Sequence, residues 1–131
     1  MVAIDAKAKI EKAMPSGYQV FSHGGTKSTG LDAVEWAKQV VKMGAGEVLL
    51  TSMDNDGTKK GFNLDLTKRV TSSINTPVIA SGGVGHLKHF VSGYKKGGAS
   101  GLLAASVFHY RQFSIKDVKR VHLDEGIPVR I

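Results

Sequence analysis

The feature that most constrains the fold of this chain is a fourfold succession of short apolar segments, each followed by a helical pattern. The apolar segments run from Val2 to Ile4, from Val48 to Leu50, from Val78 to Ala80 and from Leu102 to Ala105. They are mostly apolar without strict alternation and are bounded by Gly, Asp or Ser, as is typical of strands covered on both faces. We therefore expect four parallel, buried strands.

Amphipathic helices are predicted over residues 31–43, 64–73 and 86–96 and from Ser114 onward. The first is the clearest, because acidic residues occupy its first turn and Lys42 its last. Asn63 is predicted to cap the second helix, and Ser114 with Asp117 forms a capping-box pattern at the start of the last. Four strand–helix units predict an α/β fold that is either an open doubly wound sheet or half of an eight-stranded barrel.

The length and composition fit a single domain over residues 1–131. Lys and Arg outnumber Asp and Glu by 18 to 11, but the basic residues are scattered, so nucleic acid is not an expected partner. The chain has no cysteine, which excludes disulfides and thiolate chemistry and favours a cytoplasmic protein. No apolar run approaches the ~20 residues of a membrane span, so we expect neither a membrane anchor nor a signal peptide.

The segment from Ala6 to Gly30 is long for a connection between a strand and a helix. It contains its own alternating stretch, Tyr18 to Ser22, which predicts a mobile or hairpin-like excursion. Loops of this size usually serve a ligand.

A glycine-rich turn, Ser81-Gly82-Gly83, follows the third strand. Its glycines let the backbone approach a ligand closely, and a helix that begins near His86 would direct unpaired N–H groups at an anion. The spacing fits neither a dinucleotide fingerprint nor a nucleotide P-loop, so we expect a phosphorylated small molecule. Ser106 follows the fourth strand and is expected beside these glycines, because adjacent parallel strands share one ligand-binding rim.

Two further polar positions follow the first and second strands. Asp5 closes the first strand, where a carboxylate serves either as a general acid or base or as a turn cap. The loop from Thr51 to Gly61 has the wrong spacing for a calcium site. It is either a solvated turn or a loop in which Gly57 lends its N–H to an anion while Asp56 or Thr51 contacts a substrate hydroxyl.

Three other titratable residues, His86, His89 and Glu47, each allow more than one interpretation. His86 and His89 lie three residues apart but lack a third ligand nearby, so we interpret them as surface residues and expect no metal site. Glu47 opens a buried strand, so it either lies at the solvent edge or belongs to an ionic cluster.

Together these motifs closely resemble the C-terminal half of the cyclase subunit of imidazole glycerol phosphate synthase, from histidine biosynthesis. The matching segments follow the order of that family and cover nearly the whole chain: Val2 to Lys7, Gly44 to Ser52, Asp54 to Thr58, Ala80 to Gly83 and Leu103 to His109. The resemblance implies half of a (βα)8 TIM barrel, corresponding to barrel strands five to eight.

The resemblance also implies a lyase and cyclase that needs no metal or organic cofactor. The family uses ammonia from a partner glutaminase subunit to convert a bisphosphorylated ribulosyl-aminoimidazole carboxamide into imidazole glycerol phosphate and an aminoimidazole carboxamide ribotide. By this resemblance Asp5 matches one of two catalytic aspartates, and Glu47 matches a member of the charged gate for ammonia. The substrate phosphate site is implied at Gly57, Gly82, Gly83 and Ser106, with Thr51, Asp56 and Ser81 nearby.

The family's N-terminal half, with the other catalytic aspartate, has no counterpart in these 131 residues. Little turnover is therefore expected from the chain alone. Four strands would leave two unpaired edges and an uncovered face, so we expect self-association to complete the barrel. Two alternatives remain: a non-catalytic dimeric phosphate-binding half-barrel, and the sister isomerase of the pathway, against which the match over Asp54 to Thr58 argues.

Overall fold

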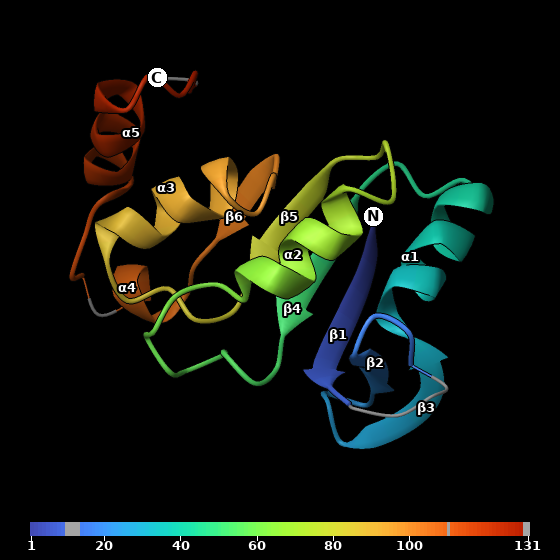
Figure 1. Ribbon diagram of the computed structural model, residues 1–131. Coiled ribbons are helices and arrows are strands. Elements are labelled where there is room, and N and C mark those ends of the chain that lie inside the picture. The colour runs from blue at the N-terminus through green and yellow to red at the C-terminus, as the bar shows by residue number, and fades with distance from the viewer. Residues whose placement is uncertain (10–13, 110, 130–131) are drawn as a thin grey trace.

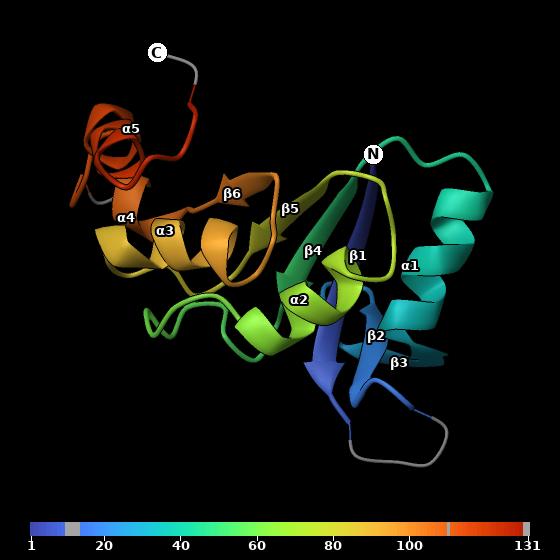
Figure 2. The ribbon, with the colours of Figure 1, turned by 45° about the horizontal axis from the view of Figure 1, so that its top comes forward.

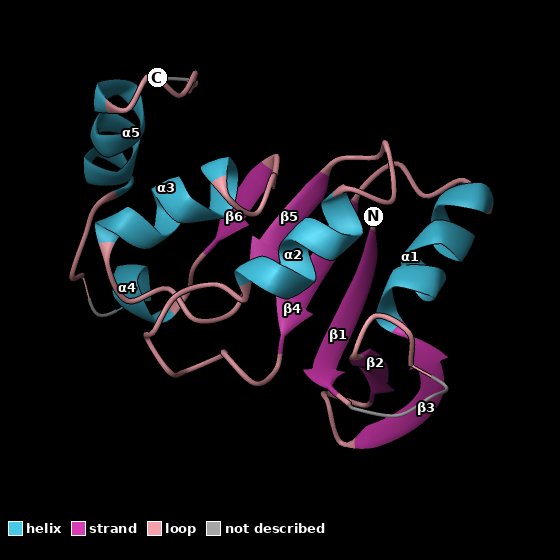
Figure 3. Ribbon diagram, viewed as in Figure 1, coloured by secondary structure: helices cyan, strands magenta, loops and turns pink. Residues whose placement is uncertain are grey.

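The computed structural model describes residues 1–9, 14–109 and 111–129 of the chain as six strands and five helices. The six strands form one sheet in the order β3-β2-β1-β4-β5-β6 (Figures 1 and 3). The elements are β1 (Val2–Ala8), β2 (Tyr18–Ser22), β3 (Lys27–Asp32), α1 (Ala33–Lys42), β4 (Val48–Ser52), α2 (Leu64–Thr71), β5 (Val78–Ser81), α3 (Leu87–Lys95), β6 (Gly101–Leu103), α4 (Ser106–His109) and α5 (Ile115–Asp124).

The four predicted parallel strands are confirmed as β1, β4, β5 and β6. Each pairs in parallel with the next, so that Ile4 lies beside Leu50, Leu50 beside Ala80, and Ala80 beside Leu102. The connections between these strands carry α1, α2 and α3, which makes each unit a strand–helix–strand crossover. The fold is an α/β sheet with the parallel core of a partial TIM-barrel-like structure.

One face of this parallel sheet is buried beneath the helices. Every second side chain is buried along β4 and β5, as are Ile4 and Ala6 in β1, and Ile4, Leu50 and Ala80 are at most 1% exposed. Helix α2 lies in front of β4 and β5 in Figure 1 and contributes Leu66 and Val70 to the same core. Burial of these side chains drives the packing of the helices on the sheet.

The opposite face of the parallel strands is only partly covered. It carries the alternate residues of each strand, including Leu49, Ile79 and Leu103, and these are half-buried or exposed. Leu103 is 41% exposed. The prediction that the strands are buried on both faces is therefore wrong for the chain by itself, whereas the expected uncovered face is present.

The segment after β1 forms the predicted hairpin. Strand β1 extends beyond Ile4 to Ala8, and its last four residues pair antiparallel with β2, which in turn pairs with β3 (Figure 2). The sequence predicted that both outer strands of the four would have an unpaired edge, and this prediction is wrong for Asp5 to Ala8 of β1. Over Val2–Ile4 the ladder has only β4 as a partner within the described residues, so this half of the edge stays open.

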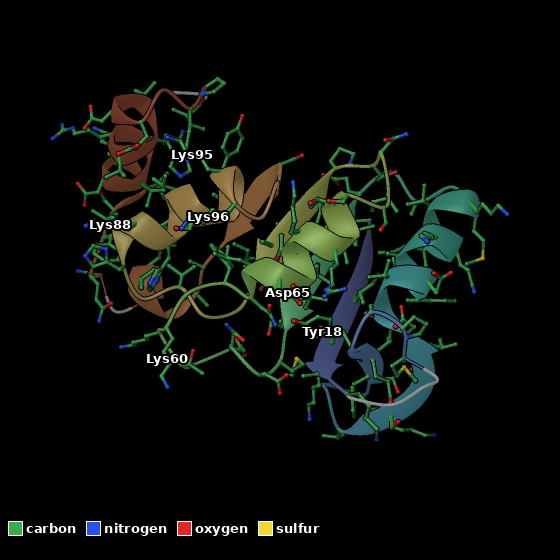
Figure 4. All side chains as sticks on the ribbon, in the orientation of Figure 1. Tyr18, Lys60, Asp65, Lys88, Lys95 and Lys96 are labelled. Carbon is green, nitrogen blue, oxygen red and sulfur yellow. The ribbon has the colours of Figure 1, made fainter. Side chains whose placement is uncertain are left out.

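The hairpin is joined to the helical layer by a tyrosine. The hydroxyl of Tyr18 on β2 donates to a carboxylate oxygen of Asp65 on α2 at 2.7 Å, and Figure 4 shows the two side chains near one another. Burial first, and then the hydrogen bond to Asp65, raise the pKa of the Tyr18 phenol. The phenol thus remains a donor at neutral pH and ties the end of the sheet to α2.

Helix starts follow the sequence signals closely. Asn63 caps α2 by accepting from the Leu66 N–H, and Ser114 with Asp117 forms the predicted capping box of α5. Asp32 caps α1, with one carboxylate oxygen accepting from the N–H groups of Val34 and Glu35 at 3.1 Å each. These caps satisfy N–H groups that the first turn of a helix leaves unpaired.

Asp32 is expected to make a pH-dependent contribution to stability. Its other oxygen accepts from the Ser16 hydroxyl and N–H, at 2.6 and 2.9 Å. Burial tends to raise the pKa of this carboxyl, but the hydrogen bonds from Ser16, Glu35 and Val34 outweigh it and lower the pKa. Stabilisation by the ionised group is therefore present above about pH 4 and is lost as the pH falls through the folded-state pKa.

Asp32→Ala should lower the free energy of unfolding at pH 7 by about 0.5–2 kcal/mol, measured by urea denaturation. The loss should begin to shrink below about pH 4 and should disappear once the pH lies below the lowered folded-state pKa of Asp32. Asp124→Ala, which removes an exposed acid at the end of α5, serves as the control and should change stability little. An unchanged stability in Asp32→Ala would contradict the assigned role.

Candidate active site

The carboxyl ends of β1, β4, β5 and β6 lie at one edge of the sheet and bring the predicted polar residues into one row. In the ladder Asp5 lies beside Thr51, Thr51 beside Ser81, and Ser81 beside Leu103. Asp5, Thr51 and Ser81 are half-buried and alternate with buried residues such as Ile4 and Ala6. The row therefore lies on the face that the helices leave open.

A small cavity of about 130 Å³ lies at the β5 and β6 end of this row. It is lined by three loop segments, which are Asp56 and Gly57 after β4, Ser81 to Val84 after β5, and Leu103 to Ala105 after β6. Ligand pockets for whole small molecules usually measure about 300–1,000 Å³. The cavity is therefore sized for a single group of a ligand, such as a phosphate.

Backbone groups give this cavity its hydrogen-bonding character. Within the described part of the chain, the N–H groups of Gly57, Gly82 and Gly83 donate to no other residue. All three glycines have positive φ, at +79°, +98° and +110°. Successive N–H groups in such conformations form concave sites that suit an anion.

Close packing behind the cavity fixes the path of Gly82 and Gly83. A Cβ on Gly82 would lie 2.6 Å from the Ser52 carbonyl oxygen, and one on Gly83 would overlap the carbonyl oxygen of Gly61. The Gly61 N–H donates to the Gly83 carbonyl at 2.7 Å, and the Asn55 side-chain amide donates to the Gly61 carbonyl at 3.0 Å. The two loops therefore hold one another without room for a side chain.

The start of α3 has fewer unpaired N–H groups than the sequence predicted. His89 Nδ1 accepts from the N–H groups of Gly85 and His86, at 3.0 and 3.1 Å, and His86 Nδ1 accepts from the Lys88 N–H at 3.1 Å. The predicted set of unpaired N–H groups is therefore reduced, because side-chain caps occupy the donors of Gly85, His86 and Lys88. His89 is half-buried instead of lying on the surface.

A sequence model of the family described as histidine biosynthesis protein matches residues 1–114. The match covers all six strands and helices α1 to α4, together with every residue of the cavity. The chain belongs to the histidine biosynthesis protein family.

The other predicted site residues of this family member lie in different places. Glu47 is exposed and precedes β4, which puts it at the opposite end of the strand from Thr51. Of the two predicted positions for Glu47, the solvent edge and an ionic cluster, the structure has the solvent edge. Ser106 begins α4 directly after Ala105, but its side chain lies outside the described residues.

Lys7 and Phe21 flank Asp5 and were not predicted as site residues. Asp5 lies opposite Phe21 in the β1–β2 ladder, and the Lys7 ammonium lies 4.8 Å from the centre of the Phe21 ring. Lys7 is two residues from Asp5 and thus lies on the same face. The alternation of side chains along β1 could have placed Lys7 on the face of Asp5. Phe21 could not be placed from sequence alone, because its position depends on the pairing of β2 with β1.

Two kinds of site have no support in the described residues. No cluster of three or more His, Asp or Glu side chains that could hold a metal ion occurs among them. Likewise, none of the described helices has the length and apolar character needed to cross a membrane.

Gly83→Ala should destabilise the loops around the cavity by about 1–3 kcal/mol, because the new methyl group meets the Gly61 carbonyl and strains a positive φ. Gly46→Ala is the matched control, since a methyl group there has no atom within 4 Å. Thermal denaturation of both variants compares them. Equal melting temperatures would contradict the described packing of Gly83 against Gly61.

Proposed function

We propose that this chain is the C-terminal half-barrel of an imidazole glycerol phosphate synthase cyclase and that it binds one phosphate of a bisphosphorylated substrate. The observation that carries the proposal is the glycine-lined cavity beside the row formed by Asp5, Thr51 and Ser81. Membership of the histidine biosynthesis family supports it. The match over Asp54 to Thr58 favours the cyclase over the sister isomerase.

Phosphate recognition rests mainly on backbone donors. The N–H groups of Gly57, Gly82 and Gly83 stabilise the oxygens of a terminal phosphate, and Ser106 is proposed to add its hydroxyl. The Asp56 carboxylate at the rim would repel a phosphate directly, so its role is to accept from a substrate hydroxyl. Thr51 and Ser81 extend the polar surface from the cavity toward β1.

Asp5 provides the acid–base group of the proposed site. A bisphosphate held at the cavity would extend along the row across β5 and β4 toward Asp5, where proton transfer takes place. Glu47 lies at the other end of the strands and is proposed to contribute to an ammonia gate there. A glutaminase subunit is the proposed source of ammonia, and it would bind at the amino-terminal ends of the strands, opposite the phosphate cavity.

The open face of the sheet supports the proposal that a further half-barrel completes the site. Leu49, Ile79 and Leu103 are accessible on this face, and the Val2–Ile4 part of β1 still has an edge to pair. The cyclase reaction as the family performs it uses two aspartates. A second half that supplies the other acid would cover the apolar face and make the site competent.

A dimeric half-barrel without turnover is a second candidate function. The same partly apolar open face favours it, because two copies related by a twofold axis would each cover the other. In that case the chain would bind phosphate esters but would have only one kind of acid in its site. Activity and solution mass separate the two candidates.

Cyclase activity should appear when the chain is mixed with the separately produced N-terminal half of a family cyclase, substrate and ammonium salt. Asp5→Asn should lower this turnover about 10²–10⁴-fold, because an amide cannot transfer the proton. Its affinity for inorganic phosphate should stay within about twofold of wild type, because the N–H donors are unchanged. Full turnover in Asp5→Asn, or strong activity of the chain alone, would contradict the proposal.

Self-association should be visible in the mass of the purified chain, measured by analytical ultracentrifugation. A dimer or larger assembly is expected, and Ile79→Glu should weaken it by placing a charge on the open face. Lys42→Glu is a control on the exposed surface of α1. A wild-type monomer at all concentrations tested would argue against closure by a second copy.

A further inference from the structure

The loop that lines the phosphate cavity is fastened at its far end by one histidine ring. The loop begins at Ser81 and reaches α3 through Gly85 and His86. His89 Nδ1 accepts from the N–H groups of both of these residues, at 3.0 and 3.1 Å. The same ring lies 3.3–3.6 Å from the position of a Cβ on Gly61.

His89 is thereby connected to the cavity through short backbone contacts. Gly61, against which the ring packs, donates its N–H to the carbonyl of Gly83, which is a cavity residue. A Cβ on Gly85 would lie 2.5 Å from the Cβ of Lys59 in the preceding loop. Displacement of Gly85 or Gly61 would therefore move Gly83 and change the arrangement of the N–H donors around the cavity.

Only the neutral ring can make both contacts at Nδ1. A lone pair on Nδ1 accepts hydrogen bonds, whereas protonation turns this nitrogen into a donor that faces two other donors. A capping box ordinarily has Glu or Gln at this third helical position, where the side chain accepts at all ordinary pH values. Histidine at this position makes the cap sensitive to acid.

The charged or titratable residues next to His89 in α3 and next to Gly61 in the adjoining loop are basic. His86 caps α3 and Lys88 belongs to its first turn, whereas Lys59 and Lys60 belong to the loop that packs on the ring through Gly61. Figure 4 shows Lys88 at the start of α3 and Lys60 on the loop below the helix. Burial first, and then the neighbouring His86, lower the pKa of the His89 ring. Because the folded state disfavours the proton, stabilisation by the cap is complete above about pH 6.5 and declines as the pH falls below it.

We propose that His89 is a positioning residue of the anion site, holding the Gly82–Gly85 segment in its binding conformation while neutral and releasing it when protonated. The inference rests on the proposed phosphate-binding function of the cavity. Beyond that function, we expect acid to weaken anion binding because His89 becomes protonated, even when the charge of the ligand does not change.

Sulfate is the probe that tests this proposal, because it keeps the same charge between pH 5 and pH 8. Titration followed by calorimetry should show sulfate binding at pH 8 that weakens about tenfold by pH 5, corresponding to the loss of roughly one hydrogen bond. His89→Gln keeps an acceptor that does not titrate, and it should bind sulfate at pH 5 as well as at pH 8. His86→Asn is the matched control, since it removes the neighbouring histidine and should retain the weakening of sulfate binding in acid, with its midpoint moved to higher pH because His86 no longer lowers the pKa of His89.

Two results would overturn the inference in distinguishable ways. Sulfate binding with the same pH dependence in His89→Gln as in wild type would reject the role of His89 and leave the anion site in place. Absence of sulfate binding at pH 8 in the wild type would reject the anion site itself and the inference with it. If His89→Gln does not fold, amide NMR shifts of Gly83 and Gly85 in the wild type must follow the titration of His89; shifts that do not follow it overturn the proposal.

Discussion

The parallel register of β1, β4, β5 and β6 is the constraint on which the rest of the structure depends. It aligns Ile4, Leu50 and Ala80 on the face that the helices bury, and this burial holds the crossovers in place. The same register necessarily aligns the intervening residues, Asp5 and Thr51 among them, on the other face. Core formation and the assembly of the polar row are therefore two consequences of one pairing pattern.

The two faces of the sheet are unequally covered, and this determines where another polypeptide could pack against the chain. A half-buried face that carries both apolar side chains and an acid at its edge is costly to leave in water, yet it is suited to meeting a complementary half. The β2–β3 hairpin limits where such a half can pair, because it occupies β1 from Asp5 to Ala8. Pairing is left possible over Val2–Ile4, at the end of the strand remote from the cavity.

Close approach of backbones explains how a shallow loop region forms a defined cavity. The carbonyl of Gly61 packs against the α-carbon of Gly83, where no side chain would fit. The His89 ring then holds Gly85 at the start of α3. In this arrangement the glycine N–H groups remain available as donors in the cavity. The N–H groups of Gly85, His86 and Lys88 are occupied by histidine rings. The anion binding that we propose would thus depend on loop conformation more than on a helix dipole.

Sequence by itself determined the four strand–helix units, the caps at Asn63 and Ser114, and the residues of the polar row, because these follow from local periodicity and short-range hydrogen bonding. Tertiary structure decided that β2 pairs with β1 beside Asp5, that His89 closes the start of α3, and that one face stays open. Each of these depends on contacts between segments distant in the chain or on whether a covering layer is present. Local patterns carry no information about such partners, so the physical reason for the difference is the range of the interactions involved.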